Sequence, residues 1–488
     1  MLPADFKENM KVLLGEDFDA FEKSYSELPF RGLRVNTLKK AGSSRDGDAA
    51  DIPRDPFGPE AYDPFEPDEL RKKEPVEWAD DTYYFGEDEY PGRNPLHEAG
   101  AYYIQEPSAA GPAAMLMRHA AECGITGLQA PVSDSAISDL SLRILDLCAA
   151  PGGKSTQLAS YMHGKGILVS NEINRSRAQI LSSNIERCCV TNALVLSEDP
   201  SKLAECFPGF FDIIMVDAPC SGEGMFRKEP AAIDEWSREN VSMCAGRQAG
   251  ILQHASEMLR DGGVICYSTC TYERAENEDI VNAFLSSHGE YSLLEMRRWM
   301  PHTDRGEGQF AAVMVKGSLP AEADIVRSYP AGGFEPADKP GMLGKVWEGF
   351  ASDVMTDAGL SLIRSLFEAN NDVPSFKYFG DNLYIMPNET PSLKGLKVQR
   401  CGLHLGSFKK DRFEPSHALA LVLTSDMVKN HIDINLDDAV RFLGGQTLTA
   451  DGPLSNGWVL VCYRGYSLGW GKIAGNVIKN HYPKGLRK

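Results

Sequence analysis

Residues 143–154 decide the fold and read Arg143-Ile-Leu-Asp-Leu-Cys-Ala-Ala-Pro-Gly-Gly-Lys154. The apolar run Ile144–Leu147 predicts a short buried strand, which ends in six small or turn-forming residues, Cys148–Gly153. Helix-forming residues follow at once, from Ser155 to Met162. A strand, a glycine turn and a helix in this order hold a nucleotide-like ligand at the carboxyl end of the first strand of an α/β sheet. The loop has neither the G-x-G-x-x-G nor the G-x-x-x-x-G-K-[ST] pattern, so by itself it does not identify the ligand.

From this stretch onward, strand-like and helix-like segments alternate, which is typical of a parallel sheet with helices on both faces. The predicted strands are 144–148, 166–172, 193–197, 211–217 and 263–268. The predicted helices are 175–188, 241–259 and 275–286, and two β segments at 291–296 and 309–316 close the sheet. We therefore expect a doubly wound α/β domain at the centre of the chain.

The flanking segments have other compositions. Residues 1–40 are mainly helical in pattern, with a strand around 31–39 whose arginines could contact phosphate but by default form a solvated face. The Pro-, Gly- and Asp-rich residues 41–92 predict a loop or an irregular small subdomain. Residues 97–117 are predicted to end in a helix, and residues 119–142 to form a surface connection. Residues 319–390 are predicted to be loops with one helix near 360–368, and residues 391–488 a compact β-rich module.

The composition is that of a globular protein with several domains. The 488 residues allow two to four domains, and 42% of them are hydrophobic and 24% charged. No run of about 18 apolar residues occurs, and the amino terminus lacks the apolar core of a signal peptide. The 11 cysteines include no C-x-x-C pair, which fits a reducing cytosol and argues against structural zinc. We expect a cytoplasmic protein without a membrane span or a bound metal.

The formal net charge of −19 at first argues against a nucleic-acid partner. The charge is unevenly distributed, however. Residues 45–90 hold 16 acidic and 5 basic side chains, whereas residues 391–488 hold 14 basic and 7 acidic ones. A basic face on an acidic protein is an electrostatic footprint for nucleic acid. On charge alone, an ordinary solvated surface explains the same distribution equally well.

Acidic residues follow the ends of three predicted strands: Glu172, Asp199 and Asp217. Ligands of open α/β sheets bind along this edge, and Glu172 lies near the spacing at which an acid meets ribose hydroxyls. Each acid taken singly is a surface or capping residue. Three of them at corresponding strand ends, after a glycine turn, favour a cofactor site.

Two cysteines stand out because they lie beyond the ends of core strands. Cys220 is in Val216-Asp-Ala-Pro-Cys-Ser-Gly-Glu-Gly224, and Cys270 is in Tyr267-Ser-Thr-Cys-Thr-Tyr272. A cysteine inside an apolar strand is usually a small core residue, which is the interpretation for Cys188, Cys189 and Cys266. Cys220 and Cys270 are expected to project into one crevice, where nearby cations would lower a thiol pKa.

A thiolate beside a methyl donor has a definite chemical use. Carbon 5 of a pyrimidine is a poor nucleophile until a thiolate adds to carbon 6 and pushes electron density onto it. Carbon 5 can then accept a methyl group, and loss of its proton allows the thiolate to leave. From the chemistry alone, either cysteine could be the one that adds.

The three core motifs, Asp146–Lys154, Asp217–Gly222 and Ser268–Thr271, resemble the Sun (NSUN) family of RNA cytosine-carbon-5 methyltransferases. Further segments resemble the same family: Arg34–Leu38, His97–Ser108 and Pro301–Gly308. Three C-terminal segments resemble its bacterial RsmF/YebU branch, which modifies small-subunit ribosomal RNA: Lys409–His417, Leu468–Lys472 and Lys479–Gly485. The resemblance covers nearly the whole chain.

The resemblance implies a role for each site residue. Cys270 would be the nucleophile, and Cys220 would assist release of the methylated RNA. Lys154 and Asp217 would lie beside the cofactor and the target base. S-adenosylmethionine would be held by Cys148, Ala149, Ala150, Pro151, Gly152, Gly153 and Lys154, with Glu172 at its ribose, Asp199 at its adenine and Asp217 near its methionine moiety.

The resemblance also implies the architecture, a class I methyltransferase (Rossmann-like) α/β sheet with an N-terminal α+β extension and a C-terminal PUA-like module. The expected domains are an RNA-recognition extension at 1–92, the methyltransferase domain at 93–318, a connecting subdomain at 319–390 and a PUA-like RNA-binding domain at 391–488. Basic residues of the last domain could contact phosphate: Lys409, Lys410, Arg412, Lys472, Lys479, Lys484 and Arg487.

The implied function is methylation of carbon 5 of a cytosine in RNA, with 16S ribosomal RNA as the expected substrate and a monomer as the expected state. The same chemistry on tRNA, or a non-catalytic RNA-binding role in ribosome assembly, are the alternatives. A decayed enzyme would be expected to lose a cysteine or a strand-end acid, and none is lost. A nicotinamide-dependent oxidoreductase would need G-x-G-x-x-G after the first strand. A DNA methyltransferase could use this chemistry, but the paired Pro-Cys and Thr-Cys motifs look like those of the RNA enzymes.

Overall fold

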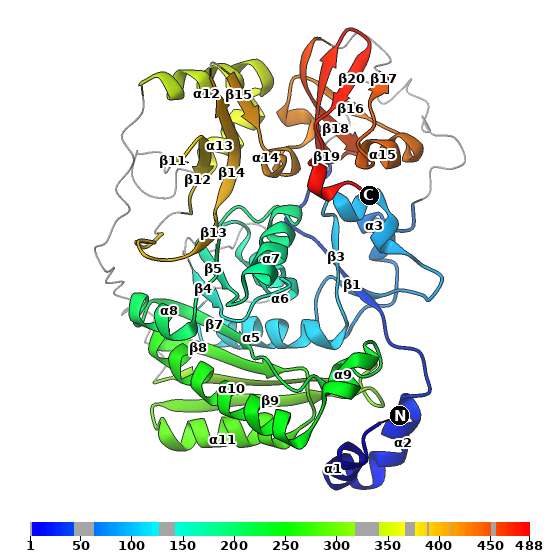
Figure 1. The fold of residues 1–488 in the computed structure, drawn as a ribbon, viewed down its shortest axis with the longest axis vertical. Coiled ribbons are helices and arrows are strands. Elements are labelled where there is room, and N and C mark those ends of the chain that lie inside the picture. The colour runs from blue at the N-terminus through cyan, green and yellow to red at the C-terminus, as the bar shows by residue number, and fades with distance from the viewer. Residues whose placement is uncertain are drawn as a thin grey trace.

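The computed structural model describes residues 2–42, 63–125, 142–317, 341–366, 376–387, 390–410, 412–449 and 455–488. Within these ranges the strands form four sheets. The largest sheet lies in the middle of the molecule, and the two sheets of the C-terminal part lie together at one end of it (Figure 1). Most of the predicted surface connection at 119–142 and of the loops in 319–390 falls outside the described residues.

The central sheet has eight strands in the order β13-β6-β5-β4-β7-β8-β10-β9. Five of them run parallel: β4 (Arg143–Asp146), β5 (Ile167–Asn171), β6 (Ala193–Leu196), β7 (Phe211–Asp217) and β8 (Leu259–Thr269). The antiparallel strands are β9 (Tyr291–Trp299), β10 (Gln309–Lys316) and β13 (Val398–Cys401). The predicted strand order along the chain is confirmed, but β13 comes from the region predicted as the C-terminal module.

Helices cover both faces of this sheet. One face packs against α5 (Gly111–Glu122), α6 (Gly153–Met162) and α7 (Arg175–Arg187). The other packs against α8 (Pro200–Cys206), α10 (Arg238–Met258) and α11 (Glu278–Ser287). The strands are buried on both faces, as parallel strands between two helical layers must be. The predicted doubly wound α/β fold is therefore confirmed.

The N-terminal helices α1 (Ala4–Leu14) and α2 (Phe18–Ser24) pack on loops of the central domain. Their Phe6 and Phe21 belong to an aromatic cluster with Phe226 and Tyr272, at ring separations of 5.1 Å (Phe6–Phe226) and 5.3 Å (Phe21–Tyr272). Both partner residues follow the predicted site cysteines closely in sequence. The first helices of the chain therefore support the loops that carry those cysteines.

A small sheet follows, formed by β1 (Gly32–Val35), β2 (Thr82–Tyr84) and β3 (Tyr102–Ile104). Short helices lie between its strands: α3 (Pro67–Leu70), η3 (Pro91–Arg93) and α4 (Pro95–Glu98). Residues 45–62 of the acidic segment lie outside the described residues. The rest of that segment, from Asp63 onward, forms part of this α+β extension and packs against the C-terminal part, where Tyr463 donates a hydrogen bond to Asp63.

The C-terminal part contains two sheets that share one apolar core. The first is β11 (Phe376–Phe379), β12 (Asn382–Ile385), β14 (Leu403–Lys409) and β15 (Arg412–Pro415). The second is β16 (His431–Asp433), β17 (Leu448–Thr449), β18 (Gly457–Tyr463), β19 (Tyr466–Ala474) and β20 (Val477–Asn480). The described helices here are α12 (Gly341–Val354), α13 (Asp357–Ser365), α14 (His417–Val422) and α15 (Leu436–Leu443).

The domain boundary predicted at residue 390 falls between β12 and β14, which pair with each other. The four-stranded sheet therefore spans that boundary. The helix α14 packs against β14 of this sheet and β19 of the other, so one apolar cluster joins the two sheets. None of the helices in the described ranges has the length and apolarity that crossing a membrane would require.

A buried lysine joins the N-terminal extension to the C-terminal part. The ammonium of Lys39 donates hydrogen bonds to the Leu421 carbonyl and to Ser467 Oγ, the latter at 2.8 Å. Burial lowers the pKa of Lys39. The carbonyl and hydroxyl would lose a buried donor if the ammonium were removed, which costs free energy.

We predict that Lys39→Met lowers the free energy of unfolding by about 1–3 kcal/mol. The neighbouring Lys40 is exposed, so Lys40→Met should change it by less than about 0.5 kcal/mol. Denaturant-induced unfolding of the two variants measures both values. Equal losses in the two variants would contradict the role assigned to Lys39.

Candidate active site

The two predicted site cysteines lie side by side. They follow the neighbouring parallel strands β7 and β8, in which Asp217 is level with Ser268. The Ala218 amide donates to the Ser268 carbonyl at 2.8 Å, so the two loops leave the sheet together. The Cys220 and Cys270 sulfur atoms are 3.2 Å apart. The expected closeness of the two thiols is therefore met, and both are half-buried.

The surroundings of the two thiols differ. The hydrogen bond from Cys220 lowers the pKa of Cys270, and the nearby Lys154 ammonium acts in the same direction. The same hydrogen bond and burial raise the pKa of Cys220, and the carboxyl of Glu276 adds to that increase. The pair therefore favours a thiolate on Cys270 and a proton on Cys220. This asymmetry supports Cys270 as the nucleophile, a choice that the residue chemistry alone left open.

Lys154 and Asp217 form an ion pair beside the thiols. Lys154 is on the first turn of α6, and its Nζ lies 2.9 Å from Asp217 Oδ2. Burial by itself would lower the pKa of Lys154, but the charge and hydrogen bond of Asp217 outweigh burial and raise it. The other carboxylate oxygen, Asp217 Oδ1, accepts hydrogen bonds from Ser268 Oγ at 2.6 Å and from Gln309 Nε2 at 3.3 Å. The lysine is thus held charged next to Cys270.

The glycine loop is held from several sides. Arg177 donates to the Ala150 carbonyl at 2.9 Å, and Asn184 donates to the Pro151 carbonyl at 2.8 Å. Gly152 has a φ of +116°, and a Cβ there would lie 3.1 Å from Leu181, so a side chain would strain this turn. The described loop therefore has a fixed backbone, as a cofactor cradle requires.

Cys148 begins the glycine loop but differs from the other two site cysteines. Burial raises the pKa of its thiol, and the carboxyl of Asp146 adds to this effect. A neutral thiol is a weak nucleophile. Cys148 is therefore suited to the wall of the site rather than to attack.

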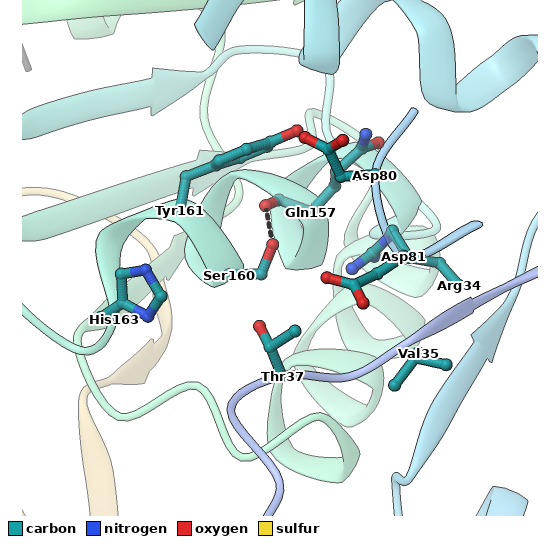
Figure 2. A pocket seen from close by; sticks show the side chains of 9 residues that line it. All are labelled: Arg34, Val35, Thr37, Asp80, Asp81, Gln157, Ser160, Tyr161 and His163. Atoms are coloured by element: carbon teal, nitrogen blue, oxygen red, sulfur yellow. Dashed lines mark hydrogen bonds between the residues drawn. The ribbon is translucent and has the colours of Figure 1, made fainter. Parts of the chain in front are cut away.

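Arg34 also holds this loop, which corrects the default interpretation of a solvated face. Its side chain is buried, and its guanidinium donates to Thr156 Oγ1 at 2.8 Å and to the Gly153 carbonyl at 3.2 Å. Arg34 also lines a cavity of about 380 Å³. Figure 2 shows Arg34 and Asp81 on one side of it, with Ser160 and Tyr161 of α6 on the other. Neither of the paired cysteines lines that cavity. Arg34 thus links the N-terminal extension to the first turn of α6.

The strand-end acids are in two different situations. Glu172 is buried, and its carboxylate accepts from the Asn174 amide at 2.9 Å and pairs with Arg177 at 3.1 Å. Asp199 is exposed and caps α8 through hydrogen bonds from the Ser201 hydroxyl and amide, which lower the pKa of Asp199. The capping interpretation therefore holds for Asp199, although it also lies at the expected edge of the sheet.

Sequence reasoning missed Asp146, the last residue of β4. Its side chain is fully buried, and burial raises its pKa to about 7. Oδ2 accepts a hydrogen bond from Ser155 at 2.6 Å, whereas Oδ1 has no partner among the described residues. Its position at the end of the first strand, directly before the glycine loop, was the available signal. A buried oxygen without a donor at this place suits a ligand that brings one.

No group of three or more His, Cys, Asp or Glu side chains in the described part of the chain could hold a metal ion. That the site works without a metal stays a prediction. Cys188, Cys189 and Cys266 are buried, as predicted for small core residues.

Comparison with known families identifies the chain. Residues 139–323 match the family model "16S rRNA methyltransferase RsmB/F". Three RsmF-specific models match other parts: its N-terminal domain at 59–107, its first C-terminal domain at 364–423 and its PUA domain at 429–488. The "Ribosomal RNA small subunit methyltransferase F" of Aeromonas hydrophila subsp. hydrophila is 30% identical, over 99% of this chain and 97% of that protein. The chain belongs to the RsmF family of 16S rRNA methyltransferases.

A second RsmF relative, from Aeromonas salmonicida, is 31% identical over the same shares of both chains. A solved structure titled "Crystal Structure of PH0851" has a TM-score of 0.53 and 22% identity, covering 64% of this chain and 66% of that one. That likeness shows the fold. The predicted family membership is confirmed, and the RsmB/F model spans the glycine loop and both cysteine loops of this RsmF-family protein.

The pKa difference between the thiols predicts their reactivity. Iodoacetamide alkylates thiolates, so the rate at Cys270 should rise with pH through a midpoint below the ordinary value of 9. In Cys220→Ala the hydrogen bond that lowers the pKa is gone, and the midpoint should move to higher pH. Peptide mass spectrometry measures both rates, with Cys123, whose pKa burial raises, as an internal reference. A midpoint that stays or falls in Cys220→Ala would contradict the assignment.

Proposed function

We propose that this protein transfers a methyl group from S-adenosylmethionine to carbon 5 of a cytosine in 16S ribosomal RNA. The observation that carries the proposal is the thiol pair, 3.2 Å apart, with Lys154 and Asp217 beside Cys270. Two thiols at one site serve a covalent addition to the base followed by a release step. The names of the RsmF relatives support ribosomal RNA as the acceptor.

The residues of the glycine loop fit S-adenosylmethionine. The buried Asp146 Oδ1, which has no described partner, could accept a hydrogen bond from a cationic ammonium group. Residues 148–154 would surround the cofactor, Glu172 would bind ribose hydroxyls, and Asp199 would lie beside the adenine. The bound cofactor supplies a methyl group on a sulfonium, ready for a carbon nucleophile.

The chain's own residues prepare the acceptor. The Cys270 thiolate forms a bond to carbon 6 of the cytosine, which moves the electron pair of the C5–C6 double bond to carbon 5. Carbon 5 would then accept the methyl group of a bound donor, whose methyl–sulfur bond would break with its electron pair left on sulfur. Lys154 offsets the negative charge of the thiolate, and Asp217 keeps that lysine in place. After methyl transfer, carbon 5 loses its proton to a base, the C5–C6 double bond re-forms, and the bond from Cys270 to carbon 6 breaks. Cys220, in contact with the leaving sulfur, assists this release.

The base must leave the RNA stack to reach this site, because addition to carbon 6 occurs from the face of the ring. The basic residues that we expect to contact phosphate are exposed or half-buried and lie in the C-terminal part: Lys409, Lys410, Arg412, Lys472, Lys479, Lys484 and Arg487. The PUA match at 429–488 supports an RNA-binding role for this part. We expect an enzyme that modifies ribosomal RNA to act in the cytoplasm, and we expect it to be a monomer.

We predict that Cys270→Ala lowers methyl transfer by at least about a thousand-fold, as loss of a covalent nucleophile does. Binding of S-adenosylmethionine should remain, because the cofactor loop is unchanged. Bisulfite sequencing of 16S RNA from cells that lack the gene, and carry either wild type or the variant, identifies the cytosine as well. Normal modification by Cys270→Ala would contradict the nucleophile assignment.

Cys220→Ala should instead accumulate a covalent protein–RNA adduct, because addition at Cys270 still occurs while release is slow. The adduct is detected as a mobility shift on a denaturing gel. Its methylated form appears only when both RNA and S-adenosylmethionine are present. The double variant with Cys270→Ala is the control and should form none. An adduct in Cys270→Ala but not in Cys220→Ala would reverse the two roles.

A further inference from the structure

A buried carboxyl, Glu223, lies between the two cysteine loops. It is three residues after Cys220 and only 1% exposed. Its Oε2 accepts hydrogen bonds from Thr271 Oγ1 at 2.9 Å and from the Tyr272 amide at 2.8 Å. A residue of the Cys220 loop is therefore bonded to both residues that follow Cys270.

Two further contacts join the same loops. The Ser221 and Thr271 hydroxyls are 2.8 Å apart, and the Gly224 amide donates to the Cys270 carbonyl at 2.9 Å. A Cβ at Gly224 would lie 2.9 Å from that carbonyl oxygen, so the two backbones touch at this point. These contacts lie next to Glu223 in sequence, and Glu223 itself accepts two of the hydrogen bonds that join the loops.

Burying the Glu223 carboxyl costs folding free energy unless its hydrogen bonds between the two loops offset that cost. Burial raises its pKa to about 8, and the nearby carboxyl of Glu273 adds to this effect. A buried carboxyl lowers stability unless donors satisfy it, and the third donor here is Trp236 Nε1, at 2.8 Å from Oε1. An apolar residue would fill a core position without this cost.

A neighbouring buried carboxyl acts differently. Glu276 Oε2 accepts from the Ser221 amide at 3.0 Å and from Gln248 Nε2 at 2.7 Å. Gln248 belongs to α10 and also donates to the Pro219 carbonyl. Glu276 and Gln248 therefore attach the Cys220 loop to α10, whereas Glu223 attaches that loop to the one that carries Cys270.

We propose that Glu223 is a positioning residue that sets the distance between Cys220 and Cys270, and so controls release of the methylated base. The inference rests on the proposed function. The bond to carbon 6 is formed by Cys270 itself, whereas release also needs Cys220 at the sulfur that leaves. Loosening the contact between the loops therefore slows release more than addition.

The test uses Glu223→Ala in the full-length protein, with 16S RNA and S-adenosylmethionine. Turnover should fall by about ten- to a hundredfold, as a misplacement near 1 Å does. The covalent adduct should accumulate as in Cys220→Ala, while the KM for S-adenosylmethionine stays within about twofold. Thr271→Val is a second variant, for use if Glu223→Ala does not fold. It keeps the side-chain shape but removes the hydroxyl that reaches Glu223 and Ser221, and it should also increase the amount of covalent adduct.

Two matched variants separate position from charge. Glu223→Gln keeps an amide oxygen that can accept from Thr271 and Tyr272, so it should restore most of the turnover that Glu223→Ala loses. Glu229 is exposed on the same segment, and its side chain does not cap the helix that it precedes, so Glu229→Ala should behave as wild type. Glu223→Gln as impaired as Glu223→Ala would contradict a positioning role.

Two other results would overturn the inference. One is unchanged turnover without adduct in both Glu223→Ala and Thr271→Val. The other is loss of adduct formation together with cofactor binding in both, which would indicate general collapse of the site. Wild type and Cys220→Ala are measured in the same series. Absence of 5-methylcytosine and of adduct in those two would contradict the proposed function itself, whereas their presence leaves only the role of Glu223 to be decided.

Discussion

The parallel pairing of β7 with β8 is the constraint on which the site depends. In a parallel sheet the carboxyl ends of neighbouring strands meet at one edge. The register places Asp217 level with Ser268, and the chain then runs three residues from Asp217 to Cys220 and two from Ser268 to Cys270. A shift of one residue would turn the following side chains to the opposite face of the sheet. Strand register thus brings the two cysteine loops side by side, and the contacts between those loops then set the sulfur–sulfur distance.

The other parts of the site follow from the strand on the opposite side of β7. Because β4 pairs with β7, the glycine loop after β4 begins beside the two cysteine loops, and the first turn of α6 brings Lys154 to Asp217. Donor loop, ion pair and thiol pair therefore lie along three adjacent strands. The N-terminal extension completes this arrangement from outside, since Arg34 holds the glycine loop and α1 and α2 pack near both cysteine loops.

The strand and helix pattern of the central domain could be predicted from the sequence because its parallel strands are apolar runs between amphipathic helices. The edge at which the acids and cysteines meet followed from that pattern. The burial of Arg34 and Asp146 could not be predicted from the sequence. Their hydrogen-bond partners come together only in the folded protein, and the sequence next to a charged residue does not show whether that residue is buried. The bridging role of Glu223 was hidden for the same reason. The place of β13 in the central sheet was missed because its pairing with β6 joins segments about 200 residues apart.

The central claim is that Cys270 carries the base while Cys220 stays free to release it. The most direct measurement uses 16S RNA transcribed with 5-fluorocytidine, because fluorine on carbon 5 cannot leave as a proton does and the adduct is trapped after methyl transfer. Digestion and mass spectrometry then identify the modified peptide. We expect a methylated fluorocytidine on the peptide that contains Cys270. The same adduct on the peptide that contains Cys220, or no adduct with active wild-type protein, would contradict the account.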